Sequence, residues 1–322
     1  MVKSSLKKNS FKQDVPLGIK EQIHQARSYI ESFQISEALD LLRNLNQENP
    51  NNEVVLFELG YLLYEQGDLA DAEKILRQSL AIAPEKNSKK YFTLGEIVSD
   101  SNESKYFFQK GLAIEEKKLQ TLSSTENVES DKIQMSKRLI SQGLCVFSEI
   151  EIREQNFKLA ESMLHKAVQV SSTYLESYSI LLHLYFNLEQ DDKFNELILK
   201  MMSQIELMKV NEDEDLTEYD TVFFNPIVRM MIECGKFKEG AFLMEIGLDN
   251  SEYSLEASYL LAFCYFNDKK INKASEVIRE MEEMNIYKSG DQELIDGFNE
   301  LKSEIAKQGG ELDDEEWESD IE

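Results

Sequence analysis

Helix-breaking residues are scarce in this sequence. Its 322 residues include only four prolines and 13 glycines, and both residue types interrupt regular helices. This composition fits a chain that is helical almost throughout. The sequence also lacks any apolar run close to the roughly 18 residues that suggest a membrane-spanning helix, and its polar N-terminus does not resemble a signal peptide. We therefore expect no association with a membrane.

Positive charge is in deficit. There are 35 Lys and Arg residues against 61 Asp and Glu, which gives a formal net charge of −26. Such an acidic chain repels phosphate groups, and this disfavours direct binding to nucleic acid or to anionic lipid. A basic partner is the natural complement. The alternative is that the acidity only keeps a long helical array soluble.

Cysteine is rare and odd in number. Cys145, Cys234 and Cys264 lie far apart in the sequence, each within an apolar helical segment. This pattern does not suggest a disulfide framework. We expect the three side chains to be reduced and buried, as in an intracellular protein.

The motifs of enzymes and metal sites are absent as well. The sequence contains no HExxH, CxxC, phosphate-binding loop, GxGxxG or GxSxG motif. A lone histidine on a helix is usually structural or solvated, and the histidines here are isolated in this way: His24, His165 and His183. We predict no catalytic activity, no cofactor and no metal site.

One stretch shows the unit from which the chain is built. Residues 53–86 have the form helix, turn, helix, stop, and read EVVLFELGYLLYEQGDLADAEKILRQSLAIAPEK. Gly60 allows a neighbouring helix to approach closely, Gly67 and Asp68 form the turn, and Pro84 ends the second helix. Neither helix could bury its apolar stripe alone. The stripe that we predict to be buried comprises Leu59, Gly60, Ala72 and Leu76, with Leu261 in a later copy.

Shifting this unit back by 34 positions reveals a second copy over residues 19–52. The matched pairs are Ala72 with Ala38, Leu76 with Leu42, Pro84 with Pro50, and Gly60 with Ala26. The unit resembles a tetratricopeptide repeat, a helical hairpin of 34 residues. Hairpins repeating at this period stack into an elongated array.

Further copies follow along the chain. A third repeat over 88–117 has a turn three residues shorter than the second, and about seven hairpins are expected in all. We therefore predict an all-α fold: an α-solenoid, or superhelix, of tetratricopeptide-like hairpins over 19–307. A last helix over about 291–307 is polar on most of one face, as a terminal cap requires.

Four segments depart from the repeat pattern. Residues 118–131 lose apolar periodicity and are expected to form a loop, and 209–220 contain the acidic insert NEDEDLTEYD. At the ends, 1–18 form a basic N-terminus and 308–322 an acidic tail with one tryptophan. We expect both ends to be disordered.

The first helices of stacked hairpins line the concave surface, and they carry our candidate partner-binding residues. Aromatic rings and carboxylates alternate there, an arrangement that suits a Lys- and Arg-rich peptide. The alternative is that the curvature of the superhelix buries some of these rings. The candidates are Phe57, Glu58, Tyr61, Tyr64, Glu65, Phe92, Glu96, Asp100, Glu149, Leu184, Glu256, Tyr259, Phe263 and Phe266.

From about residue 20 onward the chain resembles a fungal family of dedicated assembly chaperones for large-subunit ribosomal protein four. The resemblance rests on the paired opening repeats with LFELGYLLYEQGDLADAE, the shortened third repeat KKYFTLGEIVSDSNESKYFFQKGLAI, the break before the fourth repeat, and the tail DDEEWE. The opening repeats are generic to tetratricopeptide proteins. The shortened repeat and the acidic tail are more specific.

The resemblance implies a client and a place of action. In that family the concave face holds a long basic loop of the ribosomal protein until it reaches the pre-ribosome, which implies a monomeric chaperone in cytoplasm and nucleus. A scaffold subunit that binds a different basic peptide is the alternative. An enzyme subunit is a third possibility, which the lack of catalytic motifs opposes.

Overall fold

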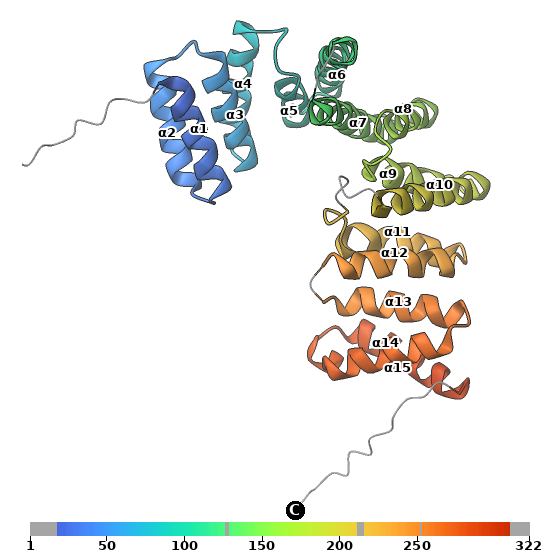
Figure 1. Ribbon diagram of the computed structural model, residues 1–322. Helices are drawn as coiled ribbons and strands as arrows, with labels where there is room; N and C mark the ends of the chain where they lie inside the picture. Colours follow the sequence, from blue (N-terminus) through green and yellow to red (C-terminus); the bar gives the residue numbers. More distant parts are fainter. Residues whose placement is uncertain (1–17, 126–128, 211–215, 252, 310–322) are drawn as a thin grey trace, which may run out of the picture. The chain divides into compact units, whose positions relative to one another are not determined.

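The computed structural model describes residues 18–125, 129–210, 216–251 and 253–309. Within these ranges the chain forms fifteen α-helices, one short 3₁₀ helix (η1, Ile286–Lys288) and no strand (Figure 1). The all-α prediction is therefore confirmed. The chain divides into two compact units, Met1–Ser136 and Lys137–Glu322, and each is described separately below.

The first unit holds three helical hairpins, each a pair of consecutive helices packed against one another. Their helices are α1 (Ile19–Glu31) with α2 (Ile35–Glu48), α3 (Glu53–Glu65) with α4 (Leu69–Ile82), and α5 (Lys89–Ile97) with α6 (Ser101–Ser124). The first two hairpins fall where the 34-residue shift places them, because α3 begins 34 residues after α1 and α4 begins 34 residues after α2.

The second unit holds four hairpins and a final helix, and α7 begins just before its boundary. The helices are α7 (Ser130–Arg153), α8 (Phe157–Val170), α9 (Glu176–Asn187), α10 (Asp191–Val210), α11 (Thr221–Glu233), α12 (Phe237–Asp249), α13 (Leu255–Asn267), α14 (Ile271–Glu283) and α15 (Gln292–Lys307). First helices of successive hairpins also touch, as α9 does α11 and α11 does α13. The described residues thus contain the predicted seven hairpins and the capping helix.

Six hairpins turn in the same way. One residue adopts a positive φ, and the backbone N–H of the next residue donates to the carbonyl five positions earlier, at 2.7–2.9 Å. This 6→1 bond ends a helix sharply because it satisfies a carbonyl of the last turn. The residues with positive φ are Phe33, Gly67, Gln155, Glu189, Gly235 and Lys269.

The third hairpin turns differently, but the sequence-based prediction of a shorter turn is wrong. Three residues separate α5 from α6, as they separate α3 from α4, and the shortening lies in α5, which has nine residues against 13 in α3. The Asp100 carboxylate accepts the Glu103 backbone N–H at 2.8 Å and caps α6. Across the same turn, the Ser104 hydroxyl donates to the Gly95 carbonyl.

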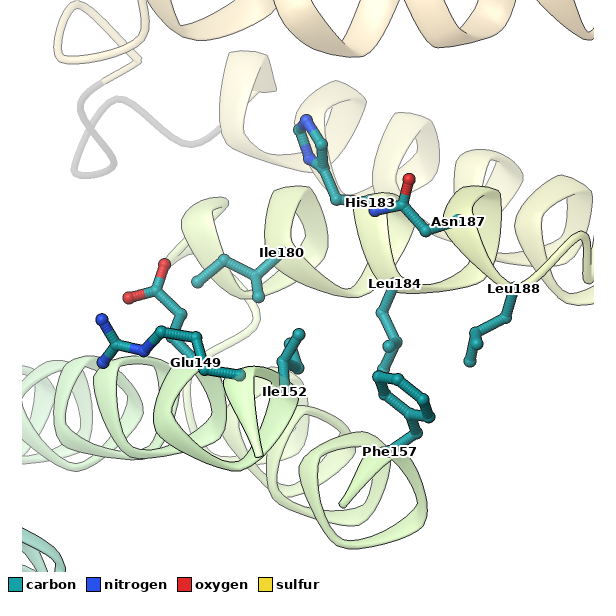
Figure 2. Close-up of a pocket in the computed structure, with 9 residues that line it drawn as sticks. Glu149, Ile152, Phe157, Ile180, His183, Leu184, Asn187 and Leu188 are labelled. Atoms are coloured by element: carbon teal, nitrogen blue, oxygen red, sulfur yellow. The ribbon is translucent and has the colours of Figure 1, made fainter. Parts of the chain in front are cut away.

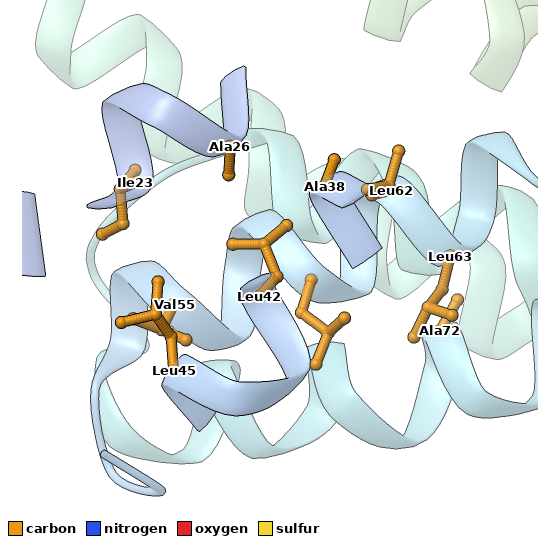
Figure 3. Close-up of a cluster of buried hydrophobic side chains, with 10 residues drawn as sticks. Ile23, Ala26, Ala38, Leu42, Leu45, Val55, Leu62, Leu63 and Ala72 are labelled. Atoms are coloured by element: carbon orange, nitrogen blue, oxygen red, sulfur yellow. The ribbon is translucent and has the colours of Figure 1, made fainter. Parts of the chain in front are cut away.

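The predicted apolar stripe is buried. Ala38, Leu42, Ala72 and Leu76 are all fully inaccessible, so the residues matched by the 34-residue shift occupy equivalent core positions. Figure 3 shows part of this core between the first two hairpins. The remaining stripe residues, Leu59, Gly60 and Leu261, are buried as well.

The loop expected over 118–131 is wrong for most of its length. Helix α6 continues to Ser124 and α7 begins at Ser130. The segment EEKKLQ consists of strong helix formers, so it stays helical without an apolar stripe. Buried Glu115 also ties α6 to its neighbours, since it accepts the hydroxyl protons of Ser88 and Ser136.

Other sequence predictions fall partly outside the described residues. The insert expected over 209–220 includes the end of α10 and the segment before α11, where Asp220 caps that helix, but 211–215 lie outside. Residues 1–17 and 310–322 also lie outside. Cys145 and Cys264 are buried, as predicted, whereas Cys234 is half-buried, and all three are free thiols.

The described residues include neither a helix that could span a membrane nor a cluster of metal-ligating side chains. None of the helices there has the length and hydropathy needed to cross a bilayer. No cluster of His, Cys, Asp and Glu in this part of the chain could hold a metal ion.

Candidate binding surfaces

Three aromatic rings lie along one side of α3. The Phe57 and Tyr61 rings stack with centroids 5.8 Å apart, and the Tyr61 and Tyr64 rings are 6.1 Å apart. Phe57 is buried against the next hairpin, whereas the two tyrosines are half-buried. The tyrosines therefore present ring surface and hydroxyl groups at the edge of the core.

Two carboxylates accompany these tyrosines. The Tyr61 hydroxyl bonds to Glu65 on the same helix, and the Tyr64 hydroxyl donates to Glu96 on α5. Partial burial and the bond to Glu65 raise the pKa of Tyr61 to about 12. Burial and the bond to Glu96 likewise raise the pKa of Tyr64. We call these four residues the tyrosine–carboxylate cluster.

The cluster already faces one cation. The Lys89 ammonium lies 6.0 Å from the centroid of the Tyr61 ring, within the range of a cation–π contact. Glu65 and Glu96 are both exposed. The arrangement combines ring faces with carboxylates, and this chemistry favours the ammonium or guanidinium group of a basic side chain.

The second unit contains two complete examples of this chemistry. Tyr185 on α9 donates to Glu161 on α8 at 2.9 Å, and the Lys193 ammonium lies 2.7 Å from that carboxylate and 5.2 Å from the ring centroid. The second example joins helices α12, α13 and α14 through Glu245, Tyr265 and Lys273. There the ammonium lies 4.9 Å from the ring centroid and 3.5 Å from the carboxylate.

Several candidates of the first unit serve its own structure. Glu58 forms an ion pair with Arg27 that joins α3 to α1, and Asp100 caps α6. Phe92 is buried and stacks on Phe108 at 6.1 Å. The expected alternative, burial by packing between helices, therefore applies to Phe57 and Phe92.

A pocket of about 650 Å³ lies in the second unit between α7, the start of α8, and α9. It brings together Glu149 and Leu184, which the sequence places in different repeats. In Figure 2 the side chains of Ile180, Leu184 and Leu188 point from α9 toward Ile152 and Phe157. We call this cavity the α7–α9 pocket, and its lining residues are Glu149, Ile152, Arg153, Phe157, Ile180, His183, Leu184, Asn187 and Leu188.

The rim of the pocket is polar. Glu149 keeps an exposed side chain, and the partial loss of water around its carboxyl raises the pKa of that group, an effect that nearby Arg153 opposes. His183 Nδ1 lies 2.9 Å from the Ser179 carbonyl. Because a carbonyl only accepts, Nδ1 carries the hydrogen in this contact.

Most of this lining lies outside the residues that the sequence indicates. Only Glu149 and Leu184 are sequence-based candidates, and the sequence predicts a structural or solvated role for His183. One signal could have revealed the others: Ile180, Leu184 and Leu188 recur every four residues along α9, which places them on one face.

The candidates on α13 lie near the end of the array. Tyr259 and Phe263 have ring centroids 6.2 Å apart, and Phe263 meets Phe237 of α12 edge to face at 6.3 Å. A β-carbon added to Gly297 of α15 would lie 2.8 Å from the Tyr259 hydroxyl, so this tyrosine packs against the capping helix. Glu256 pairs with Arg229 at 2.8 Å, and Phe266 is half-buried.

Comparisons with known proteins agree with this architecture. Residues 29–94 match a family model described as tetratricopeptide repeat. No curated protein matches the sequence. Over these residues the chain is similar to tetratricopeptide repeats, and the remaining described hairpins have the same helix–turn–helix arrangement.

A solved structure shares the fold of most of the chain. A structure described as the assembly chaperone of RpL4 (Acl4) has a TM-score of 0.63 and 18% sequence identity, over 80% of this chain and 100% of that chain. A tetratricopeptide repeat protein from Parabacteroides merdae has a TM-score of 0.48 and 15% identity, over 89% and 98%. At such identities the similarity concerns the fold alone. That fold is a helical solenoid.

Proposed function

We propose that this protein is a chaperone dedicated to one basic ribosomal protein, with large-subunit ribosomal protein four as the client. A Lys- and Arg-rich segment of the client lies on the first helices, and the chaperone delivers it to pre-ribosomes. The observation that carries the proposal is the tyrosine–carboxylate cluster of α3 and α5, with Lys89 already near one of its rings. No catalytic step is involved.

The physical logic is competition for the client's charges. A ribosomal protein must neutralise RNA phosphates, and before assembly its cations attract any polyanion in the cell. Carboxylates on the chaperone take the place of those phosphates, and ring faces cover the aliphatic stems of Lys and Arg. Each cation–π contact contributes about 0.5–2 kcal/mol, depending on how far it is desolvated.

Three further features support the proposal. The net charge of −26 complements a basic client. The paired clusters at Tyr185 and Tyr265 are internal examples of a lysine held by a tyrosine and a glutamate. The solenoid shares its fold with a protein described as the assembly chaperone of RpL4. On this proposal the chaperone is monomeric and accompanies its client from cytoplasm to nucleus.

The first experiment identifies the client. The protein is purified from cells at low and at high salt, and the proteins bound to it are identified by mass spectrometry. We expect one basic ribosomal protein, bound more strongly at low salt. A fixed set of stoichiometric subunits with no ribosomal protein would contradict the proposal and favour a scaffold.

Charge reversal then tests the surface. Glu65→Lys and Glu96→Lys should weaken client binding more than the corresponding alanine variants, because they place a like charge against the client. Tyr61→Ala and Tyr64→Ala should weaken it by upward of about 2 kcal/mol if the rings are central contacts, without changing the salt dependence.

Charge reversal of acidic residues outside the tyrosine–carboxylate cluster provides matched controls. Glu37 and Glu48 are exposed on α2, a second helix of the same unit, so Glu37→Lys and Glu48→Lys should leave client binding unchanged. Asp213→Lys and Asp215→Lys test the acidic insert, which lies outside the described residues. Normal binding by the cluster variants, with loss in the insert variants, would mean that the client is held by the insert.

A further inference from the structure

The α7–α9 pocket differs chemically from the tyrosine–carboxylate cluster because most of its lining is apolar. Its wall consists mainly of apolar side chains, from Ile152, Phe157, Ile180, Leu184 and Leu188. Leu184 is buried, and the other four are half-buried, so the apolar wall is open to solvent. A cavity of about 650 Å³ lies in the range that binds specific ligands, and such sites combine an apolar wall with a few polar groups.

The polar groups of the pocket sit at its edge. Glu149 lies at one end of the row formed by Ile180, Leu184 and Leu188, as Figure 2 shows. The lining holds one cation of its own, Arg153 of α7, which acts on the Glu149 carboxyl, and α9 adds no Lys or Arg. An occupant can place an apolar group against the wall and a cation beside Glu149, where the cation shares the carboxylate with Arg153.

The length of the row formed by Ile180, Leu184 and Leu188 determines how far apart the apolar group and the cation of an occupant lie. Ile180 and Leu188 are eight positions apart on a helical face, which corresponds to about 12 Å along the axis. An extended peptide advances about 3.3 Å per residue. An apolar side chain over Leu184, midway along the row, therefore lies about two to four residues from a basic residue that meets Glu149.

We infer that the α7–α9 pocket receives a bulky aliphatic or aromatic side chain of the basic client segment, with a Lys or Arg a few residues away paired to Glu149. This inference rests on the proposed function, and it adds an apolar contact to client binding that salt does not screen. It also gives the chaperone a means of discrimination, because a purely cationic segment cannot fill an apolar cavity. A polyamine or a lysine homopolymer would bind only through its charges.

Two labelled peptides of equal length and charge test the inference. One carries leucine about three residues from a lysine, and the other carries serine at the same position. Binding of each peptide to the full-length protein is measured by fluorescence anisotropy at several salt concentrations. We expect the leucine peptide to bind at least about tenfold more tightly, since burying one leucine is worth upward of about one factor of ten.

A variant that fills the pocket tests whether the preference for the leucine peptide arises there. Ile180→Trp should remove the advantage of the leucine peptide and leave the affinity for the serine peptide unchanged. Leu199→Trp on α10 is the control, because Leu199 is 59% exposed and outside the pocket lining. Since a tryptophan at Ile180 could disturb folding, methyl NMR of the wild-type protein provides a second measurement. The Ile152, Ile180 and Leu184 methyl signals should shift with the leucine peptide only.

The outcomes separate this inference from the proposed function. If wild-type protein binds both peptides equally and the methyl signals do not shift, the pocket assignment is wrong and the chaperone function stands. A leucine preference that survives in Ile180→Trp would place the apolar contact elsewhere and would also overturn the assignment. If neither peptide binds at any salt concentration, the proposed function fails, and the inference fails with it.

Discussion

Replacing Gly60 tests how closely α3 and α4 pack. A β-carbon added to Gly60 would lie 2.8 Å from Leu76 Cγ, 3.0 Å from Leu76 Cδ2 and 3.3 Å from Ile75 Cγ2. Carbon atoms in contact are normally about 3.5–4.0 Å apart. Even alanine therefore forces Leu76 to move, and Leu76 is fully buried in the core of the hairpin.

The magnitude follows from two opposing terms. Overpacking a well-filled core costs about 1–3 kcal/mol. Removing a glycine from a helix interior returns up to about 1 kcal/mol through helix propensity. Gly60→Ala should therefore cost less than Gly60→Leu, which adds three further carbon atoms at the same crossing. We expect a net destabilisation of roughly 1–3 kcal/mol for Gly60→Leu.

The assay is urea unfolding followed by far-ultraviolet circular dichroism. Stacked repeats need not unfold in a single step, so hydrogen exchange over α3 and α4 is measured in parallel. Lys74→Leu is the matched control, because Lys74 lies on the exposed face of α4 and should change stability by no more than about 0.5 kcal/mol. An unchanged unfolding midpoint and unchanged exchange in Gly60→Leu would refute the packing argument.

Three further predictions concern pH, a buried lysine and the tail. Burial raises the pKa of Tyr61 and of Tyr178 from 10.0 to about 12. The stabilisation that these two neutral side chains provide is therefore complete below pH 10, and it should be lost as the pH rises from about 10 to about 12. Urea unfolding midpoints measured across that pH range test this. The fully buried ammonium of Lys90 donates to the Ala83 carbonyl at 2.5 Å and lies 3.7 Å from the Glu53 carboxylate. Lys90→Met should cost about 1–3 kcal/mol in urea unfolding because it removes this charge-assisted hydrogen bond and the ion pair with Glu53. A stability equal to wild type would contradict this prediction. Residues 311–322 include eight acidic residues and lie outside the described residues. Their deletion should leave the circular dichroism spectrum unchanged and should slow client association at low salt only. Loss of the helical signal would contradict this prediction.

The hairpin architecture could be predicted from sequence because its determinants are local. Gly67 permits the left-handed turn, and the Ala72 and Leu76 positions repeat at the same spacing in the first hairpin. The helical segment before Ser124 was missed for the converse reason. It carries no apolar stripe, and its helix formers are a weaker signal than periodicity.

The candidate surface could be predicted only in part, because exposure depends on the neighbouring hairpin. Tyr61 and Phe92 both lie on first helices, yet Tyr61 remains half-buried while Phe92 is covered by Phe108 and Gly111. Phe108 and Gly111 both lie on α6, so the packing of α6 on α5 covers Phe92, and no residue spacing encodes this packing. Glu58 is similar, since its partner Arg27 lies on another hairpin.

The clusters that hold a lysine against a tyrosine show why spacing alone cannot reveal a cation site. In both, the lysine follows the tyrosine by eight residues, from Tyr185 to Lys193 and from Tyr265 to Lys273. The glutamate precedes its tyrosine by 24 residues in one cluster and by 20 in the other. A difference of four residues is about one helical turn, so the carboxylate comes from the same face of the preceding helix, α8 or α12, but one turn further along it. The two clusters therefore share their geometry and their Tyr-to-Lys spacing, while their Glu-to-Tyr spacing differs. A cation supplied by another chain, as we propose beside Tyr64, has no spacing in this sequence at all.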